Sequence, residues 1–287
     1  MKPTHLLPGF ALDLTVVDPD DGLPWDFSKS GKREKARRMR RRQKPYMLIG
    51  SPECTAFSIL QNLNKAKSKD PEAYDRARRR AKKHIEFMVE MYEEQVAEGH
   101  YFLHEHPSRA TSWQMDCMQN LTRHPETTLG HADQCQYGAE AQRGAAKGLP
   151  ILKPTGFLSN CPAVIHALSR RCTGVNGMCS RPGGDPHVSC TGIRAKDAAK
   201  YPRGLCRAMI RGITDQLKLD DLLRSGCYGM QVPDDDAAVA RELAGPAQGF
   251  SGKYRDDLSG QILKDEFVEA ARAKELLYFH PKGVWMK

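Results

Sequence analysis

The sequence predicts an α/β fold in which a mostly parallel sheet is covered by helices on both faces. Three observations predict it: an apolar run at residues 46–50, a long amphipathic segment at 70–99, and a second apolar run at 101–107. Strand, helix and strand in this order indicate a βαβ unit with two parallel strands. The chain has 287 residues, which is enough for one large domain or two small ones.

The helix expected over residues 70–99 has the clearest signals. Asp70 can cap its N-terminus, Pro71 suits the first turn, and Gly99 can close it. Its apolar side chains recur every three or four residues and form one stripe, which consists of Tyr74, Ala77, Ala81, Ile85, Met88, Tyr92 and Val96.

The remaining elements are less regular. We expect a buried strand at residues 9–17, an exposed helix at 32–43, a strand and turn at 149–160, a loop at 172–190, a helix at 201–217, a linker at 228–262 and a last helix at 265–279. The sequence thus predicts an α/β domain over residues 1–160, a small variable or substrate region at 161–227, and a linker with a C-terminal helix at 228–287.

Positive charge is concentrated in two runs. The formal net charge is +9, and "KREKARRMRRRQK" at residues 32–44 holds nine basic residues and one acidic one. A second run, "RARRRAKK", occupies residues 76–83. Such runs attract a polyanion, most commonly nucleic acid, although a solvated helix face is the alternative. The side chains expected to bind it are Arg38, Arg40, Arg41, Arg42, Arg78 and Arg79.

Cysteine usage and hydropathy indicate an intracellular protein. The nine cysteines have no framework spacing, and no apolar run approaches the ~20 residues of a membrane span. Asp13 and Asp18 interrupt the N-terminal apolar stretch, which does not resemble a signal peptide. We expect reduced thiols, no membrane partner, and a place in the nucleus or cytoplasm.

Two candidate reactive groups follow neighbouring predicted strands. Cys54 comes just after the strand at residues 46–50, and Glu105 lies near the end of the strand at 101–107. In parallel sheets, ligands bind outside the carboxyl ends of the strands. The thiol and the carboxyl group are therefore expected to face one crevice.

The residues around both groups resemble the cytosine-C5 DNA methyltransferase family. "GSPECTAFS" at residues 50–58 is similar to the family motif Gly-x-Pro-Pro-Cys-Gln-x-Phe-Ser, although Glu53 and Thr55 depart from it. "YFLHEHP" at 101–107 resembles the family strand that ends in Phe-x-x-Glu-Asn-Val. "DQCQYG" and "KPTGFLSN" resemble the sixth-strand region of divergent members, without the usual Gln-x-Arg-x-Arg. The resemblance covers roughly residues 9–160.

The resemblance implies a Rossmann-like methyltransferase domain that acts on cytosine in DNA. Cys54 would add to C6 of the base as a nucleophile, and Glu105 would hold its N3 and N4 edge as an acid with a raised pKa. The base would be flipped out or single-stranded. The same chemistry on RNA is one alternative, and a catalytically inactive nucleic-acid-binding remnant is another.

The implied cofactor is S-adenosylmethionine. In the family an acidic residue holds its ribose, which Asp13 or Asp18 could supply, and Asp26 would contact its adenine beside Phe27 and Pro52. The family's Phe-x-Gly-x-Gly loop has no counterpart in this sequence. We therefore expect the cofactor to bind weakly or not at all to this chain alone.

Simpler interpretations of these residues stay open. Cys54 could be an ordinary packed thiol, Glu105 an ion-pair partner of Arg109, and Asp26 a cap of the next turn. His104 and His106 could indicate a metal. Cys172, Cys179, His187 and Cys190 are zinc-compatible residue types, but their spacing is irregular, so no metal site is predicted.

The C-terminal residues carry a second, weaker resemblance. "YRDDLSGQILKDEFVEAARAKELLYF" at residues 254–279 is similar to the segment before the reverse transcriptase in copia-type retroelement polyproteins. The chain would then be part of a retroelement-encoded protein.

Overall fold

The computed structural model describes residues 6, 9–58, 61 and 70–222. The predictions for residues 228–262, 254–279 and 265–279 lie outside the described residues. The described helices are α1 (Ser30–Gln43), α3 (Pro71–Ala97), α4 (Asp116–Arg123), α5 (Pro162–Ala167), α6 (Ile193–Asp197) and α7 (Arg203–Leu219), with short 3₁₀ turns η1 (Thr55–Phe57), η2 (Thr111–Gln114) and η3 (Gln134–Tyr137). The strands are β1 (Met47–Gly50), β2 (Tyr101–Pro107), β3 (Thr128–Asp133), β4 (Ile151–Leu152), β5 (Pro154–Ser159) and β6 (Val188–Ser189).

The architecture is mixed α/β, which is compatible with the predicted α/β fold, and the main sheet is mixed because two of its three strand pairings are antiparallel. The main sheet has the strand order β1-β2-β5-β3. β1 and β2 are parallel, with Gly50 opposite His104, so the predicted βαβ unit is confirmed. β5 runs antiparallel to both of its neighbours, β2 and β3, which leaves β3 in the same direction as β1 and β2. A second, two-stranded sheet pairs β4 with β6 in parallel.

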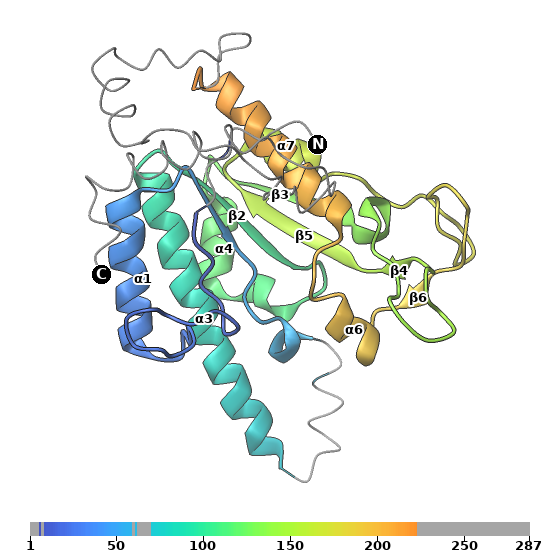
Figure 1. Cartoon of the computed structure of the whole chain (residues 1–287), viewed down its shortest axis with the longest axis horizontal. Helices are drawn as coiled ribbons and strands as arrows, with labels where there is room; N and C mark the ends of the chain where they lie inside the picture. Colours follow the sequence, from blue (N-terminus) through green and yellow to red (C-terminus); the bar gives the residue numbers. More distant parts are fainter. Residues whose placement is uncertain (1–5, 7–8, 59–60, 62–69, 223–287) are drawn as a thin grey trace, which may run out of the picture. The chain divides into compact units, whose positions relative to one another are not determined.

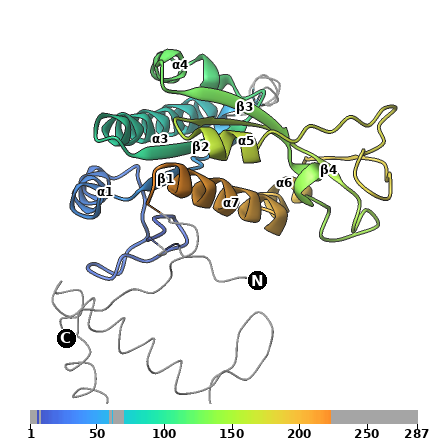
Figure 2. The ribbon, with the colours of Figure 1, turned by 90° about the horizontal axis from the view of Figure 1, so that it is seen from above.

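Helices cover both faces of the main sheet, which Figures 1 and 2 show from two directions. On one face, α3 and α4 bury Phe102 and Leu158 together with Ile85 and Met118. On the other face, α5 and α7 pack against the sheet, and Leu103 and Phe157 lie in the core beside residues of α5 and α7. Because α5 and α7 come after residue 160, the predicted boundary there does not divide the fold, and residues 1–224 form one compact unit.

The helix α3 begins and ends close to the residues that were predicted to cap it. The Asp70 carboxylate accepts a hydrogen bond from the Ala73 amide at 3.0 Å, and Pro71 occupies the first position. Gly99 has a φ of 72°, which favours glycine just beyond the helix end. The apolar stripe of α3 faces the sheet, where Ala81, Ile85 and Tyr92 are buried.

The strand predicted at residues 9–17 is wrong. This segment is irregular, and Leu14 and Val17 are 61% and 57% exposed. The Asp13 carboxylate accepts hydrogen bonds from the amide and the hydroxyl of Thr15, which folds the chain into a local turn. Asp13 therefore gives the backbone a local alternative to a strand, and only an isolated bridge, Val17 to Pro24, remains.

Candidate active site

Cys54 lies in a short loop between β1 and η1. Gly50 ends β1 against α3, where a Cβ atom would lie 1.9 Å from the hydroxyl of Tyr92, so the first motif residue must be small. After the loop, Phe57 is fully buried and its ring meets His106 edge-on at 5.8 Å. The Thr111 hydroxyl also donates to the Phe57 carbonyl at 3.2 Å. The motif thus fixes both ends of the loop and leaves Cys54 half-buried between them.

Glu105 points to one face of the sheet, and its neighbours in β2, His104 and His106, point to the other. His104 and His106 contact aromatic residues on the α3 and α4 face: Tyr92 donates to or accepts from His104 at 3.1 Å, and Trp113 meets both rings. Burial lowers the pKa of His104 to about 3 and that of His106 to about 4. Neighbouring side chains of a strand point to opposite faces, so Glu105 faces α7. The histidines are therefore neutral packing residues beneath the site.

Glu105 is buried among three polar side chains from distant parts of the chain. The Tyr201 hydroxyl donates to its Oε2 at 3.1 Å, and the amide of Gln134 approaches its Oε1 at 3.4 Å. The Lys153 ammonium lies 3.9 Å from Oε1. Burial raises the pKa of Glu105, while Lys153 and Tyr201 oppose that rise. Burial thus disfavours the ionised form of Glu105, and the two partners favour it.

The charge of Glu105 acts on the Cys54 thiol. Burial raises the pKa of the Cys54 thiol, and the negative charge of Glu105 raises it further. Lys153 acts in the opposite direction and favours the thiolate. Glu105 and Lys153 thus have opposite effects on the pKa of this thiol.

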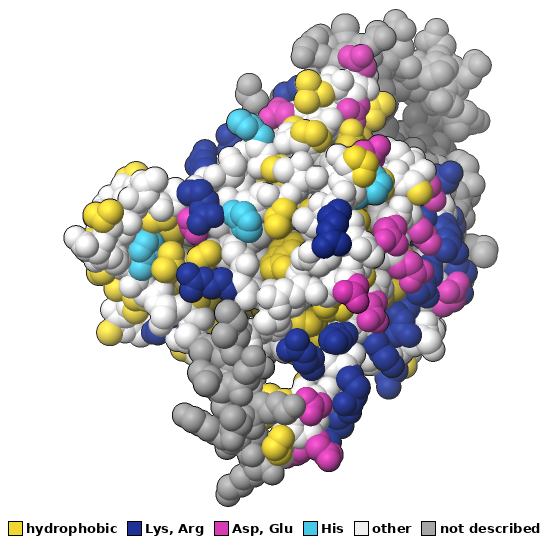
Figure 3. Space-filling model, turned by 180° about the vertical axis from the view of Figure 1, so that it is seen from behind, with side chains coloured by type: hydrophobic (Ala, Val, Ile, Leu, Met, Phe, Trp, Pro, Cys, Tyr) yellow, Lys and Arg dark blue, Asp and Glu magenta, His cyan; other side chains and the backbone are white. Residues whose placement is uncertain are grey.

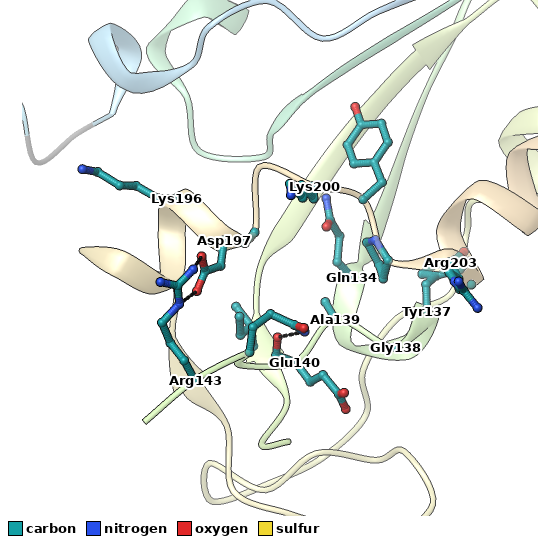
Figure 4. Close-up of a pocket in the computed structure, with 16 residues that line it drawn as sticks. Gln134, Tyr137, Gly138, Ala139, Glu140, Arg143, Lys196, Asp197, Lys200 and Arg203 are labelled. Carbon is teal, nitrogen blue, oxygen red and sulfur yellow. Dashed lines mark hydrogen bonds and ion pairs between the residues drawn. The ribbon is translucent and has the colours of Figure 1, made fainter. Parts of the chain in front are cut away.

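A pocket of about 640 Å³ is lined in part by two residues that also bind Glu105. Gln134 and Tyr201, which both bind Glu105, line it. In Figure 4 the side chains of Lys196, Lys200 and Arg203 surround the same pocket, and Arg143 is held by Asp197 at 2.6 Å. Its volume suits a ligand of nucleotide size, and its basic rim suits an anion.

Asp13 and Asp18, which were predicted to hold the ribose of the cofactor, both have other partners. Asp18 is fully buried beneath α1, where it binds Lys32 at 2.6 Å and also Lys35. Burial would raise its pKa, but these two lysines hold the pKa well below its usual value. Asp13 is exposed, and its carboxylate accepts a hydrogen bond from the Thr15 hydroxyl. Neither side chain is placed to hold a ribose beside Cys54.

Asp26, Phe27 and Pro52 lie closer to the loop. The Asp26 carboxylate accepts a hydrogen bond from the Ser28 amide at 2.9 Å, which is the capping role that the sequence left open. The Phe27 ring packs on Phe87 at 5.0 Å, and Pro52 is two residues from Cys54. The hydrogen bond of Asp26 and the ring contact of Phe27 are both internal to the protein.

Two arginines of the run at residues 32–44 bind acidic residues near the C-terminal end of α3. Arg40 is 2% exposed, and its guanidinium binds Glu94 at 2.6 Å and Glu98 at 2.9 Å. Arg41 binds Glu94 at 2.5 Å. The expectation that Arg40 faces a polyanion is therefore wrong, because this side chain fastens α1 to α3.

The other predicted arginines are on the surface or near it. Arg38 and Arg42 of α1 are exposed, and Arg79 lines a hollow with Ser28, Arg76, Arg80 and Lys83. Figure 3 shows Lys and Arg side chains collected along one side of the molecule, with Asp and Glu side chains among them. The exposed positive charge is thus divided by acidic neighbours.

Sequence reasoning missed Lys153, Tyr201 and the pairing of Gln134 with Glu105. Lys153 and Gln134 stand in the "KPTGFLSN" and "DQCQYG" stretches, but their approach to Glu105 depends on β5 pairing with β2 and β3. Within the part of the chain that the structure describes, no helix is long and apolar enough to cross a membrane. No family model matches the chain, and comparisons with curated proteins and with solved structures gave no match.

Proposed function

We propose that this chain carries the base-activating site of a cytosine-C5 methyltransferase that acts on nucleic acid, with DNA favoured over RNA. The observation that carries the proposal is the position of Cys54 just after β1 and of Glu105 in β2, the parallel neighbour of β1, and the effect of the Glu105 charge on the pKa of the thiol agrees with it. The β1–α3–β2 unit and the helices on both faces support a Rossmann-like methyltransferase fold.

The first step is addition of the Cys54 sulfur to C6 of cytosine. An S–C6 bond forms, the C5–C6 double bond is lost, and N3 takes up a proton. The thiol loses one proton and N3 gains one, and Glu105 is the group placed to exchange with both. C5 thereby becomes part of an enamine, which is a carbon nucleophile.

Lys153 and Tyr201 adjust Glu105 for this exchange. Tyr201 donates to one oxygen of the carboxyl group, which leaves the other oxygen near Gln134 and Lys153. Lys153 stabilises negative charge on either Glu105 or Cys54 as the proton moves between them. These two residues position and tune the acid, and Cys54 and Glu105 contact the base.

The proposal is confined to the steps on the base. Asp13, Asp18, Asp26, Phe27 and Pro52 do not fit S-adenosylmethionine as a set, so no step through this cofactor is derived. An enamine at C5 still has an observable outcome without a methyl donor. C5 can take a deuteron from D₂O and lose its own proton. N3 then gives back its proton, the S–C6 bond breaks, the C5–C6 double bond forms again, and the thiolate returns.

Hydrogen exchange at C5 of cytosine tests this proposal. The chain is incubated in D₂O with single-stranded and double-stranded cytosine-containing DNA and RNA, and C5 deuteration is measured by mass spectrometry. We expect exchange above the protein-free rate, complete loss in Cys54→Ala, and a fall of roughly 10²-fold in Glu105→Gln. Cys117→Ser is the matched control, because Cys117 is also half-buried but belongs to α4, which packs with α3, and this variant should catalyse C5 exchange at the wild-type rate.

Two results would contradict the proposal. One is no exchange on any of these nucleic acids by a folded chain, and the other is exchange that survives Cys54→Ala. If exchange fails while nucleic acid still binds, the chain is a binding protein without this chemistry.

The same proposal requires contacts to phosphates. We assign them to Arg38 and Arg42 of α1 and Arg78 and Arg79 of α3, and we leave Arg40 out because it is buried against α3. Replacing these four with Gln should weaken binding and flatten its salt dependence, since fewer counterions are released. Arg109→Gln combined with Arg123→Gln is the control on other exposed arginines. An unchanged salt slope in the fourfold variant would remove this surface from the interface.

A further inference from the structure

Four metal-binding side chains meet at the carboxyl end of β3. Cys135 belongs to η3, Cys172 follows α5, and Cys179 and His187 lie farther along the same loop. Their ligand atoms all lie within 4.8 Å of one another. Among the described residues this is the one group of His, Cys, Asp and Glu side chains with such geometry.

The distances inside this Cys₃His cluster match a tetrahedral zinc site. With Zn–S of about 2.3 Å and Zn–N of about 2.0–2.1 Å, tetrahedral angles place two sulfurs about 3.8 Å apart and a sulfur and a nitrogen about 3.6 Å apart. The Cys172 and Cys179 sulfurs are 3.9 Å apart, and the Cys172 sulfur is 3.6 Å from His187 Nε2. Two of the six distances between ligand atoms thus match tetrahedral zinc, and all six are within 4.8 Å.

Hydrogen-bond donors face the sulfurs of the Cys₃His cluster. The side-chain amide of Gln136 approaches Cys135 at 3.6 Å and Cys179 at 3.5 Å. The amide and the hydroxyl of Ser180 approach Cys172 at 3.4 and 3.5 Å. Donors around ligating atoms are the surroundings expected of metal-bound thiolates, because they offset the negative charge.

The loop that supplies three of the ligands has almost no core of its own. From residue 169 to residue 197, Cys179 is the only buried residue, yet the chain turns back tightly. A Cβ on Gly174 would lie 2.0 Å from the Met178 carbonyl oxygen, so this turn requires glycine. Segments that cannot bury enough apolar area are commonly fixed by a structural metal or by disulfides.

We propose that Cys135, Cys172, Cys179 and His187 bind a structural Zn²⁺ ion that fastens the loop at residues 172–187 to the end of β3. The sequence had grouped Cys190 with three of these residues, but Cys190 packs in an apolar cluster with Ala141 and Ile151. Cys135 takes its place. The zinc site does not depend on the proposed function.

The zinc site also lies next to groups that bind Glu105. Cys135 adjoins Gln134, and the chain that leaves the loop passes through α6 to Tyr201. The Cys172 amide and the Arg171 guanidinium both bind Asp133 at the end of β3, at 2.8 and 2.9 Å. Zinc would thus hold the two segments from which Gln134 and Tyr201 reach the carboxyl group.

Metal analysis of the full chain tests the proposal. The chain is produced with zinc in the medium, freed of loosely bound metal by gel filtration, and measured by elemental mass spectrometry. We expect one zinc ion per chain, X-ray absorption with sulfur and nitrogen neighbours at about 2.3 and 2.0 Å, and loss of most zinc in Cys135→Ser and Cys179→Ser. Cys190→Ser is the matched control and should keep its zinc.

A second variant keeps the test decisive if the serine variants fold poorly. His187→Cys should retain zinc with an all-sulfur shell, because four thiolates also bind zinc tetrahedrally, whereas a packing role for the imidazole predicts no such rescue. Less than about a tenth of an equivalent of zinc in the folded chain would overturn the proposal. So would a Cys172–Cys179 disulfide in the purified protein, or an unchanged zinc content in both serine variants.

Discussion

The lone thiol of Cys54 and the three thiols of the Cys₃His cluster have opposite surroundings. The negative charge of Glu105 raises the pKa of the Cys54 thiol beyond the effect of burial, with Lys153 as the opposing charge. The sulfurs of the cluster face N–H and O–H donors from Gln136 and Ser180. The first environment disfavours a thiolate at Cys54, and the second supplies donors to sulfurs that would bind a metal.

The difference shows that the partner groups, and not the cysteine itself, set the role of each sulfur. A switchable thiol suits a reaction that makes and breaks an S–C bond. A permanently stabilised thiolate suits a metal ligand, which must stay deprotonated. We therefore expect substitutions at Cys54 to change reactivity, and substitutions in the Cys₃His cluster to change stability.

The largest expected effect is the loss of stability when the metal is removed. A ligand present at about 1,000 times its Kd stabilises the folded state by about 4 kcal/mol, and one kcal/mol shifts the Tm of a domain of 150–250 residues by about 2–4 °C. A strong chelator, or Cys179→Ser, should therefore lower the Tm by about 10 °C in differential scanning fluorimetry.

Cys54→Ser provides the contrast for this stability measurement. Cys54 is half-buried and ligates nothing in the proposed scheme, so its replacement should move the Tm by no more than about 2 °C. Equal losses of stability in Cys54→Ser and Cys179→Ser would erase the distinction between the two sites.

A smaller effect concerns chemical access to the thiols. Zinc shields its ligands, so a chelator should raise the rate of iodoacetamide modification at Cys179 by about tenfold or more, which corresponds to about 1.4 kcal/mol. The rate at Cys54 should stay within about twofold, because no metal protects it. Peptide mapping by mass spectrometry separates the two sites. A chelator that accelerates both cysteines alike would contradict the assignment.

Local signals in the sequence were enough for the fold around Cys54 and Glu105. The cap at Asp70, the stripe of α3 and the glycine beyond it fix one helix between two apolar runs, and a βαβ unit follows from that order. The prediction of a strand at residues 9–17 was wrong because this segment has no partner strand in a sheet. Thr15 instead makes two hydrogen bonds to the Asp13 carboxylate, which form a local turn.

The rest of the site depends on long-range pairing. Lys153, Gln134 and Tyr201 lie 48, 29 and 96 residues from Glu105 along the chain, and antiparallel pairing of β5 with β2 and β3 brings the first two close. Cys135, the fourth ligand of the proposed zinc site, was missed for the same reason. Cys135 is separated by 37 residues from Cys172, and no local spacing reveals that the loop returns to β3.

Cys54 and Glu105 as one coupled site are tested most directly by the pH dependence of Cys54 alkylation. The wild-type midpoint should lie above that of an ordinary thiol, because burial and then Glu105 raise the pKa. Glu105→Gln removes a negative charge near the thiolate, so the midpoint of Cys54 alkylation should fall to lower pH.

Lys153→Met should shift the midpoint of Cys54 alkylation in the opposite direction, because it removes the charge that favours the thiolate. Its midpoint should rise above that of the wild-type chain. The account predicts a downward shift for Glu105→Gln and an upward shift for Lys153→Met. Identical midpoints in the wild-type chain and Glu105→Gln would contradict it, since Cys54 would then be a packed thiol that does not sense the carboxyl group.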